Sequence, residues 1–225
     1  MKHTVPSEKE VEGRREIASR NTRWAQTVSN RLSGWGITPN QISLLSIVFS
    51  AIGGGILLWQ VFRPDFSVYI ALIVYIMCIQ LRLLCNLFDG MVAVEGNKKS
   101  PNGDLYNDIP DRFSDALLII PAGYVAGGIG VELAWLAALL ATMTAYFRWI
   151  GAYKTNNHYF EGPMAKQHRM ALLTVCAAIA LIVAHEEYVS LVFLFALIIM
   201  NVGLIATLIR RLYLMSHSSS QRQEK

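Results

Sequence analysis

The chain has 225 residues and a formal net charge of +4; 53% of its residues are hydrophobic and only 16% are charged. Since soluble domains carry about 25% charged residues, this composition argues against an ordinary water-soluble globule, and the high apolar content excludes a disordered chain. The basic balance is more typical of a membrane protein anchored at its cytoplasmic face than of a protein that binds nucleic acid.

Residues 7–32 have the pattern of an amphipathic helix that precedes the apolar part of the chain. Ser7 and Glu10 are spaced as a capping box, and apolar side chains such as Trp24 share one face beside a basic rim. We expect this helix to lie in the interface of an anionic leaflet, within a cytoplasmic segment formed by residues 1–40. The alternative is a solvated charged arm.

Six apolar runs follow, and we expect each to form a transmembrane helix. The runs cover residues 42–62, 66–88, 113–131, 133–147, 170–184 and 188–209. Thr38 and Pro39 precede the first run, where threonine caps a helix and proline takes its first position. The sequence therefore predicts an all-α integral membrane protein in which an interfacial amphipathic helix precedes six transmembrane helices. Residues 41–212 form its membrane domain, and residues 213–225 form a polar tail that we expect to be disordered past Met215.

The basic residues fall almost entirely on one side of this topology. They precede the first run, flank the connections after the second and fourth runs, and follow the sixth run. The opposite side has only Arg63, together with acidic residues. This is the positive-inside distribution, so it predicts that both termini and the two long connections are cytoplasmic.

Acidic and amide side chains concentrate around the second connection. The helix formed by the second run ends in residues 86–96, where Asn86 and Asp89 are three residues apart on one helical face. The helix that leads into the third run begins with residues 103–115, which carry a narrow stripe of carboxylates at Asp104, Asp108, Asp111 and Asp115. Oxygen ligands without nearby histidine or cysteine suit Mg2+, Mn2+ or Ca2+, which would neutralise the stacked charges. The alternative is a solvated helix start whose acids pair with Arg82, Arg112, Lys98 and Lys99.

The stretch from Asn86 to Asp111 resembles the CDP-alcohol phosphotransferase family, whose pattern is DxxDGxxAR, a short spacer and GxxxDxxxD. The four acidic positions of this pattern fall on Asn86, Asp89, Asn107 and Asp111. Its small residues fall on Gly90, Ala93 and Gly103, while its arginine is replaced by Val94. The six helices, the interfacial N-terminal helix and the TPN before the first run also look like that family.

The resemblance implies a membrane-embedded transferase that moves a phosphatidyl-type group from a CDP-alcohol, such as CDP-diacylglycerol, to a hydroxyl acceptor. CMP is released, and the reaction belongs to phospholipid biosynthesis. In the family the acidic positions hold Mg2+ or Mn2+ against the CDP diphosphate. The resemblance thus implies nucleotide contacts at Asn86, Asp89, Gly90, Ala93 and Gly103, and it makes Asp111 the base for the acceptor hydroxyl. It also implies a homodimer formed through the membrane helices.

Two of the four acidic positions are asparagine, which halves the negative charge offered to a metal. Asparagine still ligates through its carbonyl oxygen, but more weakly than a carboxylate. The implied ligands are therefore Asn86, Asp89, Asn107 and Asp111, with Asp108 restoring charge beside Asn107. Glu95, Asp104 and Asp115 are further candidates for this compensation. We favour an altered site that has one strongly held metal or a displaced ligand set.

A second group of basic residues lies where the fourth and fifth runs meet their connection. Arg148 ends the fourth run, and Lys166 and Arg169 lead into the fifth on one helical face. If the helices pack as in the family, these side chains point into the same cytoplasmic cavity and hold a phosphorylated or polyol acceptor. The positive-inside rule alone also predicts basic residues here.

Two other classes of function stay open. A non-catalytic relative that binds CDP-lipid or scaffolds a partner is consistent with Asn86, Val94 and Asn107. A small transporter or channel would use the acidic stripe as an ion path, but the internal repeat that favours such a protein is not visible.

Overall fold

The computed structural model describes residues 22–95, 103–155, 159–183 and 186–223. In chain order its helices are α1 (Arg23–Gly34), α2 (Pro39–Phe62), α3 (Val68–Glu95), α4 (Gly103–Ala126), α5 (Ile129–Thr155), α6 (Lys166–Val183) and α7 (Glu186–Gln223). Every regular element in these four ranges is an α-helix, so the predicted all-α class is confirmed.

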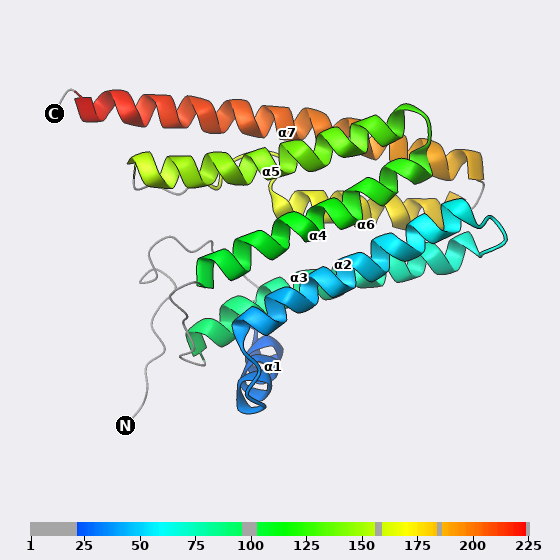
Figure 1. Cartoon of the computed structure of the whole chain (residues 1–225), viewed down its shortest axis with the longest axis horizontal. Helices are drawn as coiled ribbons and strands as arrows, with labels where there is room; N and C mark the ends of the chain where they lie inside the picture. The colour runs from blue at the N-terminus through cyan, green and yellow to red at the C-terminus, as the bar shows by residue number, and fades with distance from the viewer. Residues whose placement is uncertain (1–21, 96–102, 156–158, 184–185, 224–225) are drawn as a thin grey trace.

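The helices α2 to α7 run side by side along the length of the molecule, and α1 lies crosswise at one end (Figure 1). Extensive contacts join α2 to α3 and α4, and α5 to α4 and α7, while α6 packs against α3 and α7. α1 and the last turns of α7 lie at the same end of the bundle, at the left of Figure 1. We call this end the site end. Because α1 and the end of α7 lie at the same end, the helices between them run along the bundle an even number of times.

Five of the described helices, α2, α3, α5, α6 and α7, are long and apolar enough to cross a membrane. The sixth expected span, α4, has 24 residues and lies along the bundle like the others. It carries Asp111, Arg112 and Asp115 within its apolar part, so it falls outside this group on composition. Many large apolar side chains point outward, such as Val48 on α2 and Phe195 on α7. These features fit an integral membrane protein.

Local sequence explains where α2 begins. The Thr38 hydroxyl accepts from the Gln41 backbone N–H at 3.3 Å, and the Gln41 side-chain oxygen accepts from the Thr38 N–H at 3.0 Å. These two bonds form a capping box, and Pro39 occupies the first turn, where its missing N–H costs nothing. The predicted start of the first membrane helix is confirmed.

The two ends of the chain differ from the prediction. α1 begins at Arg23, and the earlier part of the predicted 7–32 helix lies outside the described residues. One face of α1 packs against α3, where Trp24 meets Phe88 edge-on at 5.9 Å. The disorder predicted past Met215 is wrong as far as Gln223, because α7 continues to that residue. Adding residues to an existing helix avoids the cost of nucleation, so a polar segment can extend a long apolar helix.

The site-end bounds of three other helices also lie beyond the apolar runs. α3 continues to Glu95, α4 begins at Gly103 and α5 continues to Thr155. Hydropathy detects only the membrane-embedded part of a helix, so the apolar runs end before these polar turns. The helical spacing of the acidic and amide residues predicted the turns of α3 and α4, but not those of α5. These polar turns carry part of the candidate site.

The packing of α2 against α4 depends on Gly54. A Cβ atom at this position would lie 1.9 Å from the backbone carbonyl oxygen of Leu117. Small residues allow such close approach of helix backbones in membranes. At Gly55, the next residue, a Cβ atom would meet no neighbouring helix within 4 Å, so this position is a matched control.

We expect Gly54→Ala to destabilise the bundle by about 1–3 kcal/mol, because the backbone at Leu117 cannot move aside as a flexible side chain would. The readout is the apparent Tm in detergent, followed by size-exclusion chromatography after heating. Gly55→Ala is expected to behave like wild type. Equal stability of the two variants would contradict the close α2–α4 contact.

Candidate functional site

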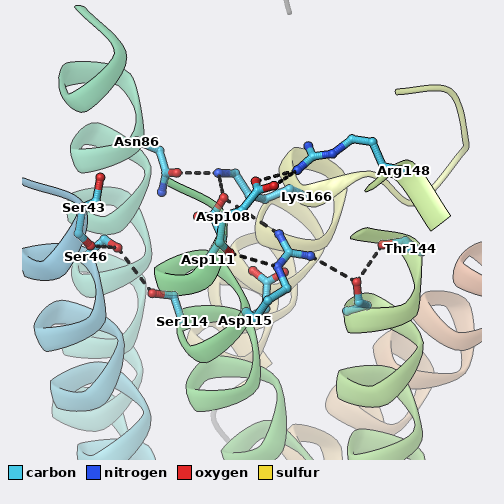
Figure 2. Close-up of polar contacts among 12 residues, drawn as sticks. Ser43, Ser46, Asn86, Asp108, Asp111, Ser114, Asp115, Thr144, Arg148 and Lys166 are labelled. Atoms are coloured by element: carbon cyan, nitrogen blue, oxygen red, sulfur yellow. Dashed lines mark hydrogen bonds and ion pairs between the residues drawn. The ribbon is translucent and has the colours of Figure 1, made fainter. Parts of the chain in front are cut away.

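Polar side chains from four helices meet near the site end of the bundle (Figure 2). Asn86 comes from α3, Asp108 and Asp111 from α4, Arg148 from α5, and Lys166 from the first turn of α6. Helix starts and ends that are far apart in the sequence thus supply neighbouring charges.

Lys166 lies between α3 and α4. Its ammonium group donates to the Asn86 side-chain oxygen and to Oδ2 of Asp111. The Asn86 amide nitrogen donates to the Arg82 carbonyl oxygen at 3.0 Å, which turns the amide oxygen toward Lys166. The Lys166 side chain is 25% exposed, whereas the Asp111 side chain is 5% exposed. The ammonium therefore covers a buried carboxylate from the more open side.

A buried ion cluster lies one helical turn below Asp111. Arg82 contacts Asp111 at 3.3 Å and Asp115 at 2.7 Å, and Arg169 donates to the other oxygen of Asp115. Arg169 also donates to the Met164 carbonyl oxygen at 2.9 Å. The side chains of Arg82, Asp115 and Arg169 are at most 2% exposed. These contacts tie α3, α4 and α6 together in the protein interior.

Removing one member of this cluster leaves uncompensated buried charge. We expect Asp115→Ala to destabilise the protein by about 3–5 kcal/mol, because Arg82 loses its shorter ion pair and Arg169 loses its carboxylate. The measurement is the apparent Tm in detergent. Asp65→Ala, at an exposed position in the α2–α3 connection, serves as the control and should leave the Tm unchanged. A wild-type Tm for Asp115→Ala would contradict a stabilising role.

Asp108 faces α5. Arg148 donates to both oxygens of its carboxylate, and the Trp149 indole nitrogen donates to Oδ2 at 2.6 Å. Its neighbour Asn107 is exposed and takes no part in the contacts described for Asp108 and Asp111. The resemblance implies that Asp108 restores the negative charge that is missing at Asn107. In the structure, the Arg148 guanidinium already neutralises the Asp108 carboxylate.

Asp89 is buried against α2. The Ser43 hydroxyl donates to Oδ2 at 2.8 Å, and the Gly90 backbone N–H donates to Oδ1. Asp89 shares one face of α3 with Asn86, the residue that accepts a hydrogen bond from Lys166. It therefore belongs to the same electrostatic environment as the Lys166 contact, although it makes different hydrogen bonds.

The structure brings together some of the predicted site residues and separates others. Asn86 and Asp111 meet through Lys166, with Asp89 nearby, whereas Asn107 points outward. Of the predicted nucleotide contacts, Gly90 and Ala93 follow Asp89 on α3, and Gly103 begins α4. Of the predicted acceptor residues, Arg148 binds Asp108, Lys166 binds Asp111 and Arg169 is buried with Asp115.

The interpretation that the acids pair with basic residues is confirmed in part. Arg82 contacts Asp111 and Asp115, and Arg112 lies 3.9 Å from Asp111. Lys98 and Lys99 are outside the described residues, as are the side chains of Glu95 and Asp104.

The sequence named Arg82 only as a partner of the acids in the alternative interpretation, and it did not assign Ser43 or Trp149 to the site. A signal existed for Arg82, because a charge retained inside an apolar run usually serves a polar interior. Ser43 and Trp149 have no comparable signal, since serine and tryptophan are common in membrane helices for other reasons.

The donors around Asp111 do not fit a divalent metal. Within the part of the chain that the structure describes, no group of three or more histidine, cysteine, aspartate or glutamate side chains is arranged to hold a metal ion. The described side chains around Asp111 include five cations and four carboxylates. The cations are Arg82, Arg112, Arg148, Lys166 and Arg169, and the carboxylates are Asp89, Asp108, Asp111 and Asp115. Among these described side chains, a divalent ion between α3 and α4 would therefore meet the Lys166 ammonium group and one more cation than carboxylates.

The chain matches no family model and no curated protein sequence. It does share its fold with crystal structures of phosphatidylinositol phosphate synthase from Mycobacterium tuberculosis. The structure with CDP-DAG bound has 16% sequence identity and a TM-score of 0.69, over 86% of this chain and 94% of that one. The complex with manganese and citrate has 15% identity and a TM-score of 0.68, over 85% and 88% of the two chains. The similarity supports the sequence resemblance at the level of the fold.

Proposed function

We propose that this protein is an integral-membrane transferase that moves a substituted phosphate group from a CDP-alcohol to a hydroxyl acceptor in phospholipid biosynthesis. The main support is the contact of Lys166 with Asn86 and Asp111, which joins three helices near the site end. The fold is shared with an enzyme whose structure was solved with CDP-DAG bound. CDP-diacylglycerol is the donor that we propose. The distribution of basic residues supports a cytoplasmic position for this end.

The proposed reaction forms one bond and breaks another at the lipid-side phosphorus. The acceptor oxygen forms a bond to phosphorus, the bond between phosphorus and the bridging oxygen breaks, and CMP leaves with that electron pair. The acceptor proton passes to the Asp111 carboxylate. Enzymes accelerate such a transfer mainly by positioning the reactants and stabilising charge on the phosphate oxygens.

In the proposed reaction Lys166 binds the phosphate oxygens and Asp111 accepts the proton. The Lys166 ammonium group is partly exposed, so an incoming diphosphate can compete for it with Asp111. When Lys166 turns to the phosphate oxygens, one Asp111 oxygen loses its ammonium partner and is free to accept the proton of the acceptor hydroxyl. Binding of the charged donor thereby prepares the group that accepts the proton.

Roles for the remaining predicted residues follow from their contacts. We propose that Asp89, Gly90, Ala93 and Gly103 line the nucleotide side. Arg148 is half-buried and binds Asp108, and we propose that it contacts an anionic or polyol acceptor. The remaining acceptor candidate, Arg169, acts indirectly, because it holds Asp115 and so fixes α4 against α6. A homodimer through the membrane helices completes the proposal.

Divalent metal enters the proposal only through the fold. The manganese complex of the mycobacterial synthase suggests that enzymes with this fold use a divalent ion, which would be Mg2+ or Mn2+ in a cell. The donors described here do not fit such an ion. We therefore propose that the protein's own cations neutralise the phosphate charge.

The test is a transfer assay on purified full-length protein in lipid nanodiscs. CDP-diacylglycerol is supplied with a panel of acceptors, including glycerol phosphate and inositol phosphate, and CMP release is measured. Acceptor-dependent CMP release supports the transferase. Binding of CDP-diacylglycerol without release for any acceptor would instead favour a non-catalytic relative, which the exposed Asn107 and the neutralised Asp108 also fit.

A further inference from the structure

The Lys166 ammonium group occupies the space between α3 and α4 where the resemblance places a divalent ion. It touches Asn86 and Asp111, which align with the first and last acidic positions of the family pattern. Figure 2 shows the Lys166 side chain reaching between these two residues from α6. One cation of the protein thus bridges two positions at which the family uses metal ligands.

The charges at these positions match a monovalent cation. Asn86 is neutral and accepts one hydrogen bond from the ammonium group, while Asp111 supplies the carboxylate. An aspartate at position 86 would add a negative charge that a divalent ion needs and that an ammonium group does not. Asparagine at position 86 and lysine at position 166 are therefore mutually consistent.

Arg82 adds to the surplus of positive charge beneath Lys166. Its side chain is fully buried, and one terminal nitrogen contacts Asp111 and Asp115. Its Nε and its other terminal nitrogen are buried without a hydrogen-bond partner among the described residues. A divalent ion placed next to this guanidinium would be repelled, whereas a phosphate oxygen would be attracted.

We infer that Lys166, supported by Arg82, replaces the divalent metal in this site, so that the protein binds the diphosphate of its ligand without a divalent ion. An ammonium group has three N–H donors. Two donate to Asn86 and Asp111, and the third can meet a phosphate oxygen before the ammonium group turns away from Asp111. This inference rests on the proposed function for the identity of the ligand, but metal binding tests it whether or not transfer occurs.

The first experiment measures Mn2+ binding by electron paramagnetic resonance on full-length protein in nanodiscs of neutral lipid, with and without CDP-diacylglycerol. We expect the signal of free Mn2+ to equal that of empty nanodiscs through the millimolar range. We also expect the affinity for CDP-diacylglycerol to be the same in Mn2+ as in chelator. Stoichiometric Mn2+ binding that Asp111→Asn abolishes, or a gain of tenfold or more in lipid affinity with Mn2+, would overturn the inference.

The second experiment restores the family-like donors. The double variant Asn86→Asp, Lys166→Met removes the ammonium group and adds a carboxylate, so we expect it to bind one Mn2+ ion. Lys154→Met, at an exposed position near the end of α5, is the control and should bind none. A folded double variant that binds no Mn2+ would overturn the inference. If the double variant does not fold, the wild-type measurements decide.

Different results would contradict the transferase activity and the replacement of the metal by Lys166. Absence of CMP release with every acceptor would contradict the transferase while leaving the Mn2+ result unaffected. CMP release that chelator abolishes would support the transferase and contradict replacement of the metal.

Discussion

Asp111→Asn is expected to lower the rate of CMP release by about 10²–10⁴-fold, the range typical of a positioned general base. The amide cannot accept the proton of the acceptor hydroxyl, although it has nearly the same shape as the carboxylate. Asp111 is buried and contacts the fully buried Arg82, so this contact holds it in place when Lys166 turns to the substrate.

The same variant is expected to bind CDP-diacylglycerol at least as well as wild type. Loss of the carboxylate frees the Lys166 ammonium group for the phosphate oxygens. The assay therefore pairs CMP release with lipid binding and with the apparent Tm, which shows whether the protein is folded. Asp65→Asn, at the opposite end of the bundle, is the control. Unchanged CMP release in Asp111→Asn would rule out Asp111 as the base.

Lys166→Met is expected to lower CMP release by about 10²–10³-fold, the usual cost of losing one group that stabilises charge in the transition state. In contrast to Asp111→Asn, it should also weaken binding of CDP-diacylglycerol, because the ammonium group contacts the diphosphate before and during transfer. Methionine retains much of the length and apolar character of the lysine stem, so packing in the first turn of α6 is largely kept.

The variant Lys166→Arg tests whether positive charge alone is sufficient at this position or whether the shape of the ammonium group is also needed. A guanidinium keeps the positive charge but has a planar set of donors, so we expect partial recovery of binding and less recovery of CMP release. Lys154→Met should match wild type in both measurements. Full activity in Lys166→Met would show that another cation neutralises the phosphate.

We expect loss of Asp115 to lower mainly the stability of the protein, and loss of Asp111 to lower mainly its activity. Asp115 contacts two buried guanidinium groups, and its loss is expected to act first on the Tm. Asp111 lies one turn nearer the site end and shares a partly exposed cation, so its loss is expected to act first on the rate. The difference arises because the cations that bind Asp115 are buried, whereas Lys166, which binds Asp111, is partly exposed to solvent.

Several features of the site follow from local sequence. The spacing of Asn86 and Asp89 predicts a shared helical face, and both residues lie on α3 near the site end. The Thr38–Pro39 start of α2 is also local, because a cap needs only residues within one turn. Apolar runs predict membrane helices because a span of about 30 Å requires them.

Other features depend on partners far apart in the chain. Lys166 lies 80 residues from Asn86, and Arg148 lies 40 residues from Asp108. The sequence predicts that these basic residues lie near the same end as the acids. It does not predict which base meets which acid, because the partner depends on the helix rotation that packing imposes.

The sequence by itself determined the helical class, the apolar spans, the capped start of α2 and the clustering of charge near one end, since each depends on residues within a few turns. Only the tertiary structure decided that Lys166 closes the gap between Asn86 and Asp111, that Arg82 and Arg169 enclose Asp115, and that Asn107 faces outward. The physical reason is that close packing at positions such as Gly54 sets the separation and rotation of the helices, and these determine which side chains meet.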